Sequence, residues 1–139
     1  MSLRDWEQLP LPAPIPELVV KPDRMQIFMF SAATWNRHHI HYDKDAAIAE
    51  GLPDVVVQRA LIGDFFARLL TEWLGDDGEI RKLSWKVTQS APPDTALRCL
   101  GDVLTVETAA GVRHADCELH MVDDAGRDIA TGRARLCLY

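Results

Sequence analysis

The sequence predicts an α+β domain in which one long helix packs on one face of a curled antiparallel sheet. Two observations carry this prediction. Between residues 61 and 74, apolar residues recur with the spacing of a helix that buries one broad face. After Gly78 the period changes to two, which is typical of half-buried strands. A single helical run followed by four or five strands indicates the α+β class.

The N-terminal segment is expected to be an extended arm. Five of the eight prolines lie in the first 22 residues. Proline fixes φ and lacks the backbone N–H, so this segment cannot join a helix or a central strand. We expect residues 1–17 to form the arm, residues 18–21 a short edge strand, and residues 18–139 a single domain. A proline-rich ligand for another protein is the alternative interpretation.

Two short helices are predicted next. Asp23 is suited to cap a helix that ends near Ala33, and Asp43 to cap a second helix over 44–50, which Gly51 would stop. The stretch between them, 34–42, has no clean period and is dense in polar groups. It is therefore the first place to look for chemistry.

The long helix and the strands follow from apolar spacing. The helix is expected to cover about 17 residues and to end at Gly75. Turns are expected at 91–94, 109–111 and 123–126, where small, polar or proline residues gather. The alternating apolar residues that define the strands are Leu83, Trp85, Val87, Leu97, Cys99, Leu104, Val106, Cys117, Leu119, Met121, Ala134, Leu136 and Leu138.

Composition excludes several classes of protein. The chain has 139 residues, with 15 basic against 21 acidic side chains and a net charge of −6. A general nucleic-acid binder would need a basic face, so that class is excluded. No apolar run approaches the roughly 20 residues of a membrane span, and the N-terminus lacks the features of a signal peptide. The three cysteines, in apolar segments and without a CxxC pair, favour a reducing cytoplasm.

The candidate site is the segment 36–43, which holds three of the five histidines. Structural hydrogen bonds in a loop are one explanation. A metal site through His39 and His41 is a second, although no further ligand set accompanies them. Acid–base catalysis by one histidine, whose ordinary pKa lies near working pH, is a third. Nucleophilic catalysis is less favoured, because no serine sits in a nucleophile elbow and the cysteines lie in predicted strands.

The stretch Phe30-Ser-Ala-Ala-Thr-Trp-Asn-Arg-His-His-Ile-His-Tyr-Asp43, followed by Ala47, Gly51 and an apolar run into the long helix, resembles the MaoC-like hydratases and dehydratases. It is most similar to their 3-hydroxyacyl-thioester dehydratase variant. The resemblance extends from about Leu18 to the end. It implies a hotdog fold, in which a curved antiparallel sheet wraps a long central helix.

The resemblance also implies an activity, which is reversible addition of water to a trans-2-enoyl thioester to give an (R)-3-hydroxyacyl thioester without a cofactor. His41 matches the catalytic histidine of the family and Asn36 the position of its aspartate. An amide cannot take a proton from water. His41 alone would therefore act as base and then as acid, with Asn36 orienting the water. His38 and Tyr42 are the expected substrate-binding neighbours.

The start of the long helix is expected to bind the thioester. Its free N–H groups favour the negative charge of an enolate oxygen. Where the family has His-Gly, this chain has Gln58-Arg59. The Arg59 N–H could still serve, and its side chain could instead hold a phosphate of CoA or a carboxylated acyl group.

The resemblance places the active site at an interface between chains, so we expect a homodimer or a heteromer with another MaoC-like chain. The substrate would be acyl-CoA or a carrier-bound acyl thioester. Three alternatives to a self-sufficient hydratase stay open. The chain could be a subunit that shares its site with a different MaoC-like chain, as in steroid side-chain hydratases. It could also be a hotdog thioesterase, or a non-catalytic acyl-CoA binding module.

Overall fold

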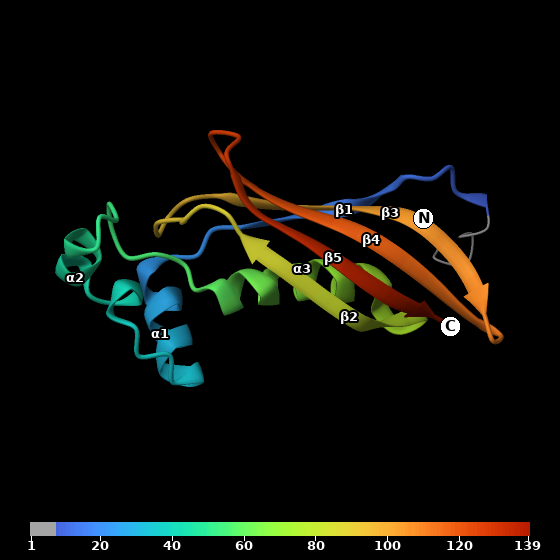
Figure 1. Cartoon of the computed structure of the whole chain (residues 1–139), viewed down its shortest axis with the longest axis horizontal. Coiled ribbons are helices and arrows are strands. Elements are labelled where there is room, and N and C mark those ends of the chain that lie inside the picture. The colour runs from blue at the N-terminus through green and yellow to red at the C-terminus, as the bar shows by residue number, and fades with distance from the viewer. Residues whose placement is uncertain (1–7) are drawn as a thin grey trace.

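The structure is a computed structural model that describes residues 8–139. Its frame is a five-stranded, fully antiparallel sheet with the strand order β1-β3-β4-β5-β2 (Figure 1). The strands are β1 (Ala13–Val20), β2 (Gly78–Val87), β3 (Leu97–Ala109), β4 (Val112–Asp123) and β5 (Asp128–Leu138). This arrangement confirms the α+β prediction.

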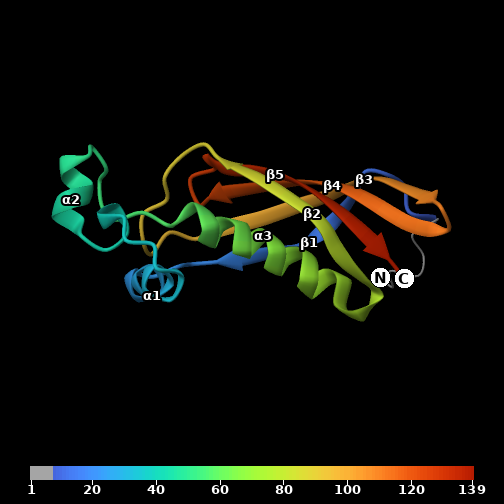
Figure 2. The ribbon, with the colours of Figure 1, turned by 60° about the horizontal axis from the view of Figure 1, so that its bottom comes forward.

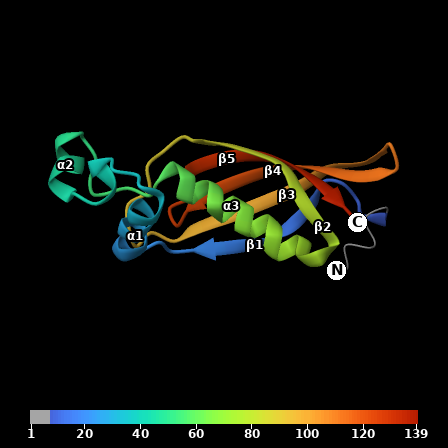
Figure 3. The ribbon, with the colours of Figure 1, turned by 90° about the horizontal axis from the view of Figure 1, so that it is seen from below.

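The long helix α3 (Arg59–Leu74) lies across one face of this sheet, as Figures 2 and 3 show. Two short helices, α1 (Arg24–Thr34) and α2 (Lys44–Ala49), lie beyond the N-terminal end of α3, with the 3₁₀ turn η2 (His39–His41) between them along the chain. A second 3₁₀ turn, η3 (Gly75–Asp77), leads from α3 into β2. The segment singled out as the candidate site therefore lies near the start of α3.

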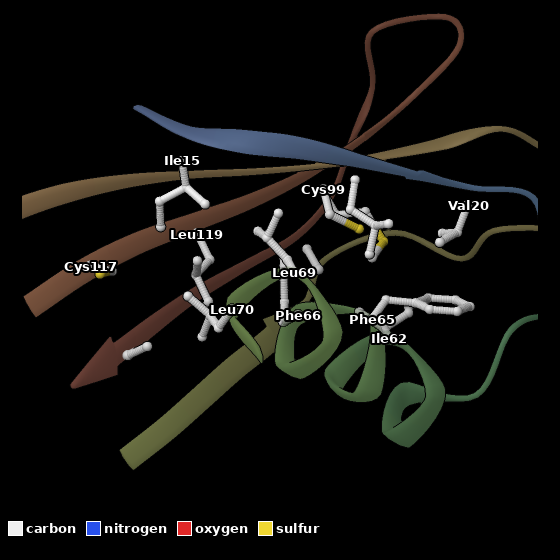
Figure 4. Packing of buried hydrophobic residues seen from close by; sticks show 14 of the residues in the cluster. Ile15, Val20, Ile62, Phe65, Phe66, Leu69, Leu70, Cys99, Cys117 and Leu119 are labelled. Carbon is white, nitrogen blue, oxygen red and sulfur yellow. The ribbon is translucent and has the colours of Figure 1, made fainter. Parts of the chain in front are cut away.

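The core lies between α3 and the sheet. Figure 4 shows Ile62, Phe66 and Leu70 of the helix directed toward strand residues such as Cys99 and Leu119, and all five are fully buried or nearly so. Burying one such large apolar side chain contributes roughly 1.5–3 kcal/mol. The apolar stripe of α3 is thus what fixes the helix, and with it the helix start, against the sheet.

Both predicted N-caps are present. The Asp23 carboxylate accepts a hydrogen bond from the Gln26 N–H at 2.7 Å, and that of Asp43 accepts from the Ala46 N–H at 3.1 Å. A carboxylate at this position satisfies an N–H that has no acceptor within the helix. Helix α2 ends at Ala49, one residue before the expected end.

The first strand begins earlier than the sequence indicated. β1 starts at Ala13, so five residues of the expected arm belong to the sheet and the expected start at 18 was wrong. Pro14 and Pro16 are tolerated because β1 is an edge strand, which among the strands described pairs with β3 alone. An edge strand needs hydrogen bonds on one side only. Of the rest of the expected arm, residues 1–7 lie outside the described residues, and the division between arm and domain stays a prediction.

The two apolar segments around Cys99 and Val106 form one strand. The pairing of β3 with β4 shifts between Val103 and Thr105, so Leu104 is an extra residue in the ladder. A bulge of this kind changes which alternate residues face the core. It accounts for the change from odd to even apolar positions that made one strand resemble two.

The remaining loops and cysteines agree with the sequence predictions. The turns after β3 and β4 place Gly111 and Gly126 at positive φ, as tight turns favour. The three cysteines are free and buried. Within residues 8–139, no helix combines the length and the apolar character that a membrane crossing needs.

Candidate active site

The position of Asn36 follows from the way α1 ends. Trp35 adopts the left-handed conformation, with φ at 56°, and reverses the chain. The Asn36 N–H then donates to the Ser31 carbonyl at 3.0 Å. In the next turn, the side-chain oxygen of Asn36 accepts from the His38 N–H at 3.3 Å. This small turn leaves the side-chain NH₂ of Asn36 as its remaining donor.

His41 is held in one orientation by the segment before α3. Its Nδ1 lies 2.7 Å from the Val56 carbonyl oxygen, which can only accept, so Nδ1 carries the proton. The Val56 N–H in turn donates to the Ile40 carbonyl at 3.0 Å, and the two bonds clasp η2 to this segment. In neutral His41 the lone pair is therefore on Nε2, which is the nitrogen available to act as a base.

The surroundings of His41 favour its neutral form. Burial lowers its pKa below the ordinary value of 6.5, and the neighbouring His38 lowers it further, while the hydrogen bond to Val56 acts in the opposite direction. The two imidazole rings lie 5.9 Å apart between centroids. At neutral pH, His41 is thus predominantly unprotonated, as a general base must be.

Next to His41 lies an open pocket of about 830 Å³. It is bounded by the loop with η2, the start of α3 and the end of β2 with the residues that follow it. Its lining residues are Asn36, His38, Ile40, His41, Val56, Val57, Arg59, Ala60, Trp85, Val87, Thr88, Gln89 and Ser90. The pocket thus unites four of the six residues that the sequence singled out, and its size is in the usual range for a small-molecule site.

The N-terminal turn of α3 opens into this pocket through Arg59 and Ala60. The first bond that closes this turn runs from the Ile62 N–H to the Gln58 carbonyl, so the N–H groups of residues 59–61 precede the helical ladder. Such a terminus carries partial positive charge. The indole N–H of Trp85 donates to the Arg59 carbonyl at 2.9 Å and fixes the backbone of this turn.

Gln58 and Tyr42 are placed differently from expectation. The Gln58 side chain is completely buried and does not line the pocket. Its NH₂ donates to the Ile27 carbonyl at 2.6 Å and to the Ser31 hydroxyl at 2.8 Å, which ties α1 to the start of α3. Tyr42 also lies outside the pocket, and its hydroxyl donates to the Arg37 carbonyl at 2.9 Å. Both side chains support the loop instead of facing the space beside His41.

The described residues offer no cluster of three or more His, Cys, Asp or Glu side chains that could hold a metal. His39 is exposed, and its ring packs against that of Tyr42 at 5.7 Å between centroids. The two histidines considered as a metal pair therefore have different surroundings, since only His41 lines the pocket.

Comparison with known proteins now identifies the family. The profile of the hydroxyacyl-thioester dehydratase type 2 family matches residues 7–93. The chain belongs to this family. The match includes α1, the histidine loop and α3, together with the end of β2 that lines the pocket.

Solved structures show that this dehydratase-family chain has the MaoC-like hotdog fold. The (R)-hydratase of A. caviae superposes with a TM-score of 0.85 at 16% identity, covering 96% of this chain and 99% of that one. The ChsH1-ChsH2 complex of Mycobacterium tuberculosis contains a chain with a TM-score of 0.84 at 21% identity, covering 95% and 100%. The predicted hotdog fold is thereby confirmed.

A curated relative is the mesaconyl-C(4)-CoA hydratase of Chloroflexus aurantiacus. It is 44% identical over a segment that covers 38% of this chain. That segment spans only 23% of the relative's own length.

Sequence reasoning missed the far wall of the pocket in this family member. Trp85 was interpreted as core, and it does pack against the core, but its indole also lines the pocket. Thr88, Gln89 and Ser90 complete that wall. No local motif marks these residues, because the pairing of β2 with β5 and the packing of α3 bring them to the site.

Proposed function

We propose that the chain hydrates trans-2-enoyl thioesters reversibly and forms (R)-3-hydroxyacyl thioesters, with His41 as the only acid–base group. The observation that carries this proposal is the hydrogen bond from His41 Nδ1 to the Val56 carbonyl, beside an open pocket. It leaves an unprotonated Nε2 as the base. Membership in the dehydratase family and the hydratase activity named for the curated relative support the same reaction class.

The reaction would proceed by one shuttled proton. His41 Nε2 removes a proton from water as the water oxygen bonds to C3 of the enoyl group. The electrons of the C2–C3 double bond move toward the thioester, whose oxygen becomes negative. The imidazolium then returns the proton to C2 and regenerates neutral His41. His41 activates the water that bonds to C3 and also protonates C2, so both additions take place on the same face of the double bond and the addition is syn.

Two further groups would assist this proton transfer. The Asn36 NH₂ donates to the water oxygen and aims a water proton at His41, but it takes no proton itself. The Arg59 N–H donates to the developing enolate oxygen, where the dipole of α3 adds to the effect. Gln58 acts indirectly, by fixing the start of α3 against α1.

The oligomeric state is the second part of the proposed function. We propose that the chain works as a homodimer or with a second MaoC-like chain, a mode that the ChsH1-ChsH2 complex exemplifies. Two features favour a partner. Strand β2 is at a sheet edge, and six large side chains of the region from α1 to α2 are exposed, namely Met25, Phe28, Met29, Trp35, Tyr42 and Ile48. Exposed apolar groups gathered in this way are typical of interaction surfaces.

The activity can be tested with purified chain and crotonyl-CoA. Hydration removes the conjugated double bond, so the ultraviolet absorbance of the enone should fall and 3-hydroxybutyryl-CoA should accumulate. Short, long and steroid-like enoyl thioesters extend the test. Flat absorbance with all of them refutes a self-sufficient hydratase, and recovery on adding a second MaoC-like chain would then indicate a shared site. Release of free thiol would instead indicate a thioesterase.

A further inference from the structure

We propose that the acyl group carries a carboxylate and that the Arg59 guanidinium binds it. This inference rests on the proposed function for the nature of the thioester, and it adds the substrate class. Its starting point is the charge of the pocket wall. Although 21 of the 139 residues are acidic, no Asp or Glu among residues 8–139 lines the pocket, and within that range Arg59 is the one lining residue with a permanent charge.

In the part of the chain that the structure describes, Arg59 differs from most arginines in having no acidic partner. Arg24, Arg68 and Arg98, for example, form ion pairs at 2.6–2.8 Å. Within residues 8–139, no hydrogen bond or ion pair of the Arg59 side chain is present. Gly63 occupies the i+4 position at which Arg68 finds Glu72, so Arg59 lacks the corresponding acidic neighbour on its helix. An exposed, uncompensated guanidinium at a pocket is suited to a planar anion.

The backbone of Arg59 is fixed while its side chain is not. The Trp85 indole N–H holds the Arg59 carbonyl at 2.9 Å, and the same indole packs against Gly63 one turn later. The backbone position from which the Arg59 side chain extends is therefore fixed at the pocket. Its guanidinium can turn into the pocket without breaking an existing ion pair.

The position of Arg59 favours a carboxylate on the acyl group over a phosphate of CoA. In the proposed reaction the thioester oxygen faces the Arg59 N–H, so the side chain begins beside the reacting carbons. The pantetheine arm separates the thioester sulfur from the nearest phosphate by a long flexible chain. A carboxylate at the far end of a short acyl group is only a few bonds away. One arginine can pair with both of its oxygens.

Binding of two unreactive thioesters tests this proposal without relying on catalysis. Succinyl-CoA and butyryl-CoA differ only in a terminal carboxylate in place of a methyl group. Titration calorimetry should give a Kd for succinyl-CoA lower by about 10- to 100-fold, as expected of a charge-assisted hydrogen-bonded pair. Arg59→Gln should abolish the difference, and Arg59→Lys should restore part of it. Arg68→Gln, the same charge change on the same helix outside the pocket, should leave the ratio intact.

The other outcomes identify the failing step. Arg59→Gln could instead weaken the binding of succinyl-CoA and butyryl-CoA equally. If it then leaves the affinity for the corresponding pantetheine thioesters, which lack the phosphates of CoA, unchanged, Arg59 binds a CoA phosphate and the proposal is wrong. Equal Kd values in the wild type also overturn it. In the hydration assay, fumaryl-CoA should exceed crotonyl-CoA in kcat/KM in the wild type but not in Arg59→Gln. If the wild type hydrates fumaryl-CoA and crotonyl-CoA at equal rates, the carboxylate site is refuted but the hydratase activity is not. If it hydrates neither substrate, the hydratase activity is refuted.

Discussion

The close packing of Gly63 against Trp85 gives the sharpest prediction about how the fold supports the site. A Cβ at position 63 would lie 2.5 Å from Cε2 and 2.6 Å from Cη2 of the Trp85 indole, and closer still to Cζ2. Gly63→Ala must therefore displace the indole. That movement strains the hydrogen bond from the indole N–H to the Arg59 carbonyl and alters the wall of the pocket.

The magnitude follows from three contributions. Overpacking costs about 1–3 kcal/mol, and loss of the Trp85 hydrogen bond costs about 1 kcal/mol. Alanine in place of glycine within a helix returns about 1 kcal/mol. We expect a net loss of about 2 kcal/mol in the free energy of unfolding, which lowers Tm by about 8 °C for a chain of this length. Asp64→Ala, at the next and exposed helix position, should change stability by no more than about 0.5 kcal/mol.

Urea unfolding of a double-mutant cycle with Trp85→Phe provides the measurement. Phenylalanine lacks the part of the indole ring that a Cβ at 63 would strike. In the Trp85→Phe background, Gly63→Ala should therefore be neutral or stabilising, and the two effects should not add. Additive effects, or a stabilised Gly63→Ala single variant, would refute the proposed contact.

Four further results are expected. The hydration rate should fall as the pH drops through the pKa of His41, because only the neutral imidazole accepts a proton. Burial lowers that pKa, so an inflection of the pH–rate profile above 6.5 would contradict the role of His41 as the base. Asn36→Asp should keep or raise kcat, and a loss of more than tenfold would show that Asn36 does not orient the water. Gln58→Leu removes two donated hydrogen bonds and should lower the free energy of unfolding in urea by about 1–3 kcal/mol. An unchanged free energy of unfolding would show that these bonds between α1 and α3 do not stabilise the chain. Burial raises the pKa of Cys99 and Cys117 to about 12, so a thiol reagent at pH 8 should label these two residues only after unfolding.

Local patterns in the sequence were sufficient to predict most helices and their ends. The caps at Asp23 and Asp43 depend on a side chain and an N–H three residues later, and the apolar stripe of α3 depends on spacing within one helix. Features that depend on distant pairing were less accessible. The start of β1 at Ala13 is set by its partner β3, and the bulge at Leu104 by its partner β4.

The site divides in the same way. His41 and Asn36 could be singled out because they lie in one dense polar segment that resembles a known motif. Trp85 carried only an alternating apolar signal, and its place in the pocket arises from the packing of β2 beside α3. Gln58 and Tyr42 are adjacent in sequence to pocket residues, yet their side chains turn away to bond with Ser31 and Arg37. The direction of a side chain in an irregular loop depends on tertiary partners, which spacing alone does not reveal.

The most direct test of His41 as the acid–base group is the hydration rate of His41→Gln compared with that of His39→Gln. Glutamine is close to histidine in length and carries a side-chain N–H donor but cannot take a proton, and His39 is an exposed histidine two residues away outside the pocket. With unchanged circular dichroism, His41→Gln should lose about 10²- to 10⁴-fold in kcat on the best enoyl thioester, and His39→Gln should stay within about twofold of the wild type. Retention of the wild-type rate by His41→Gln would contradict the proposed mechanism.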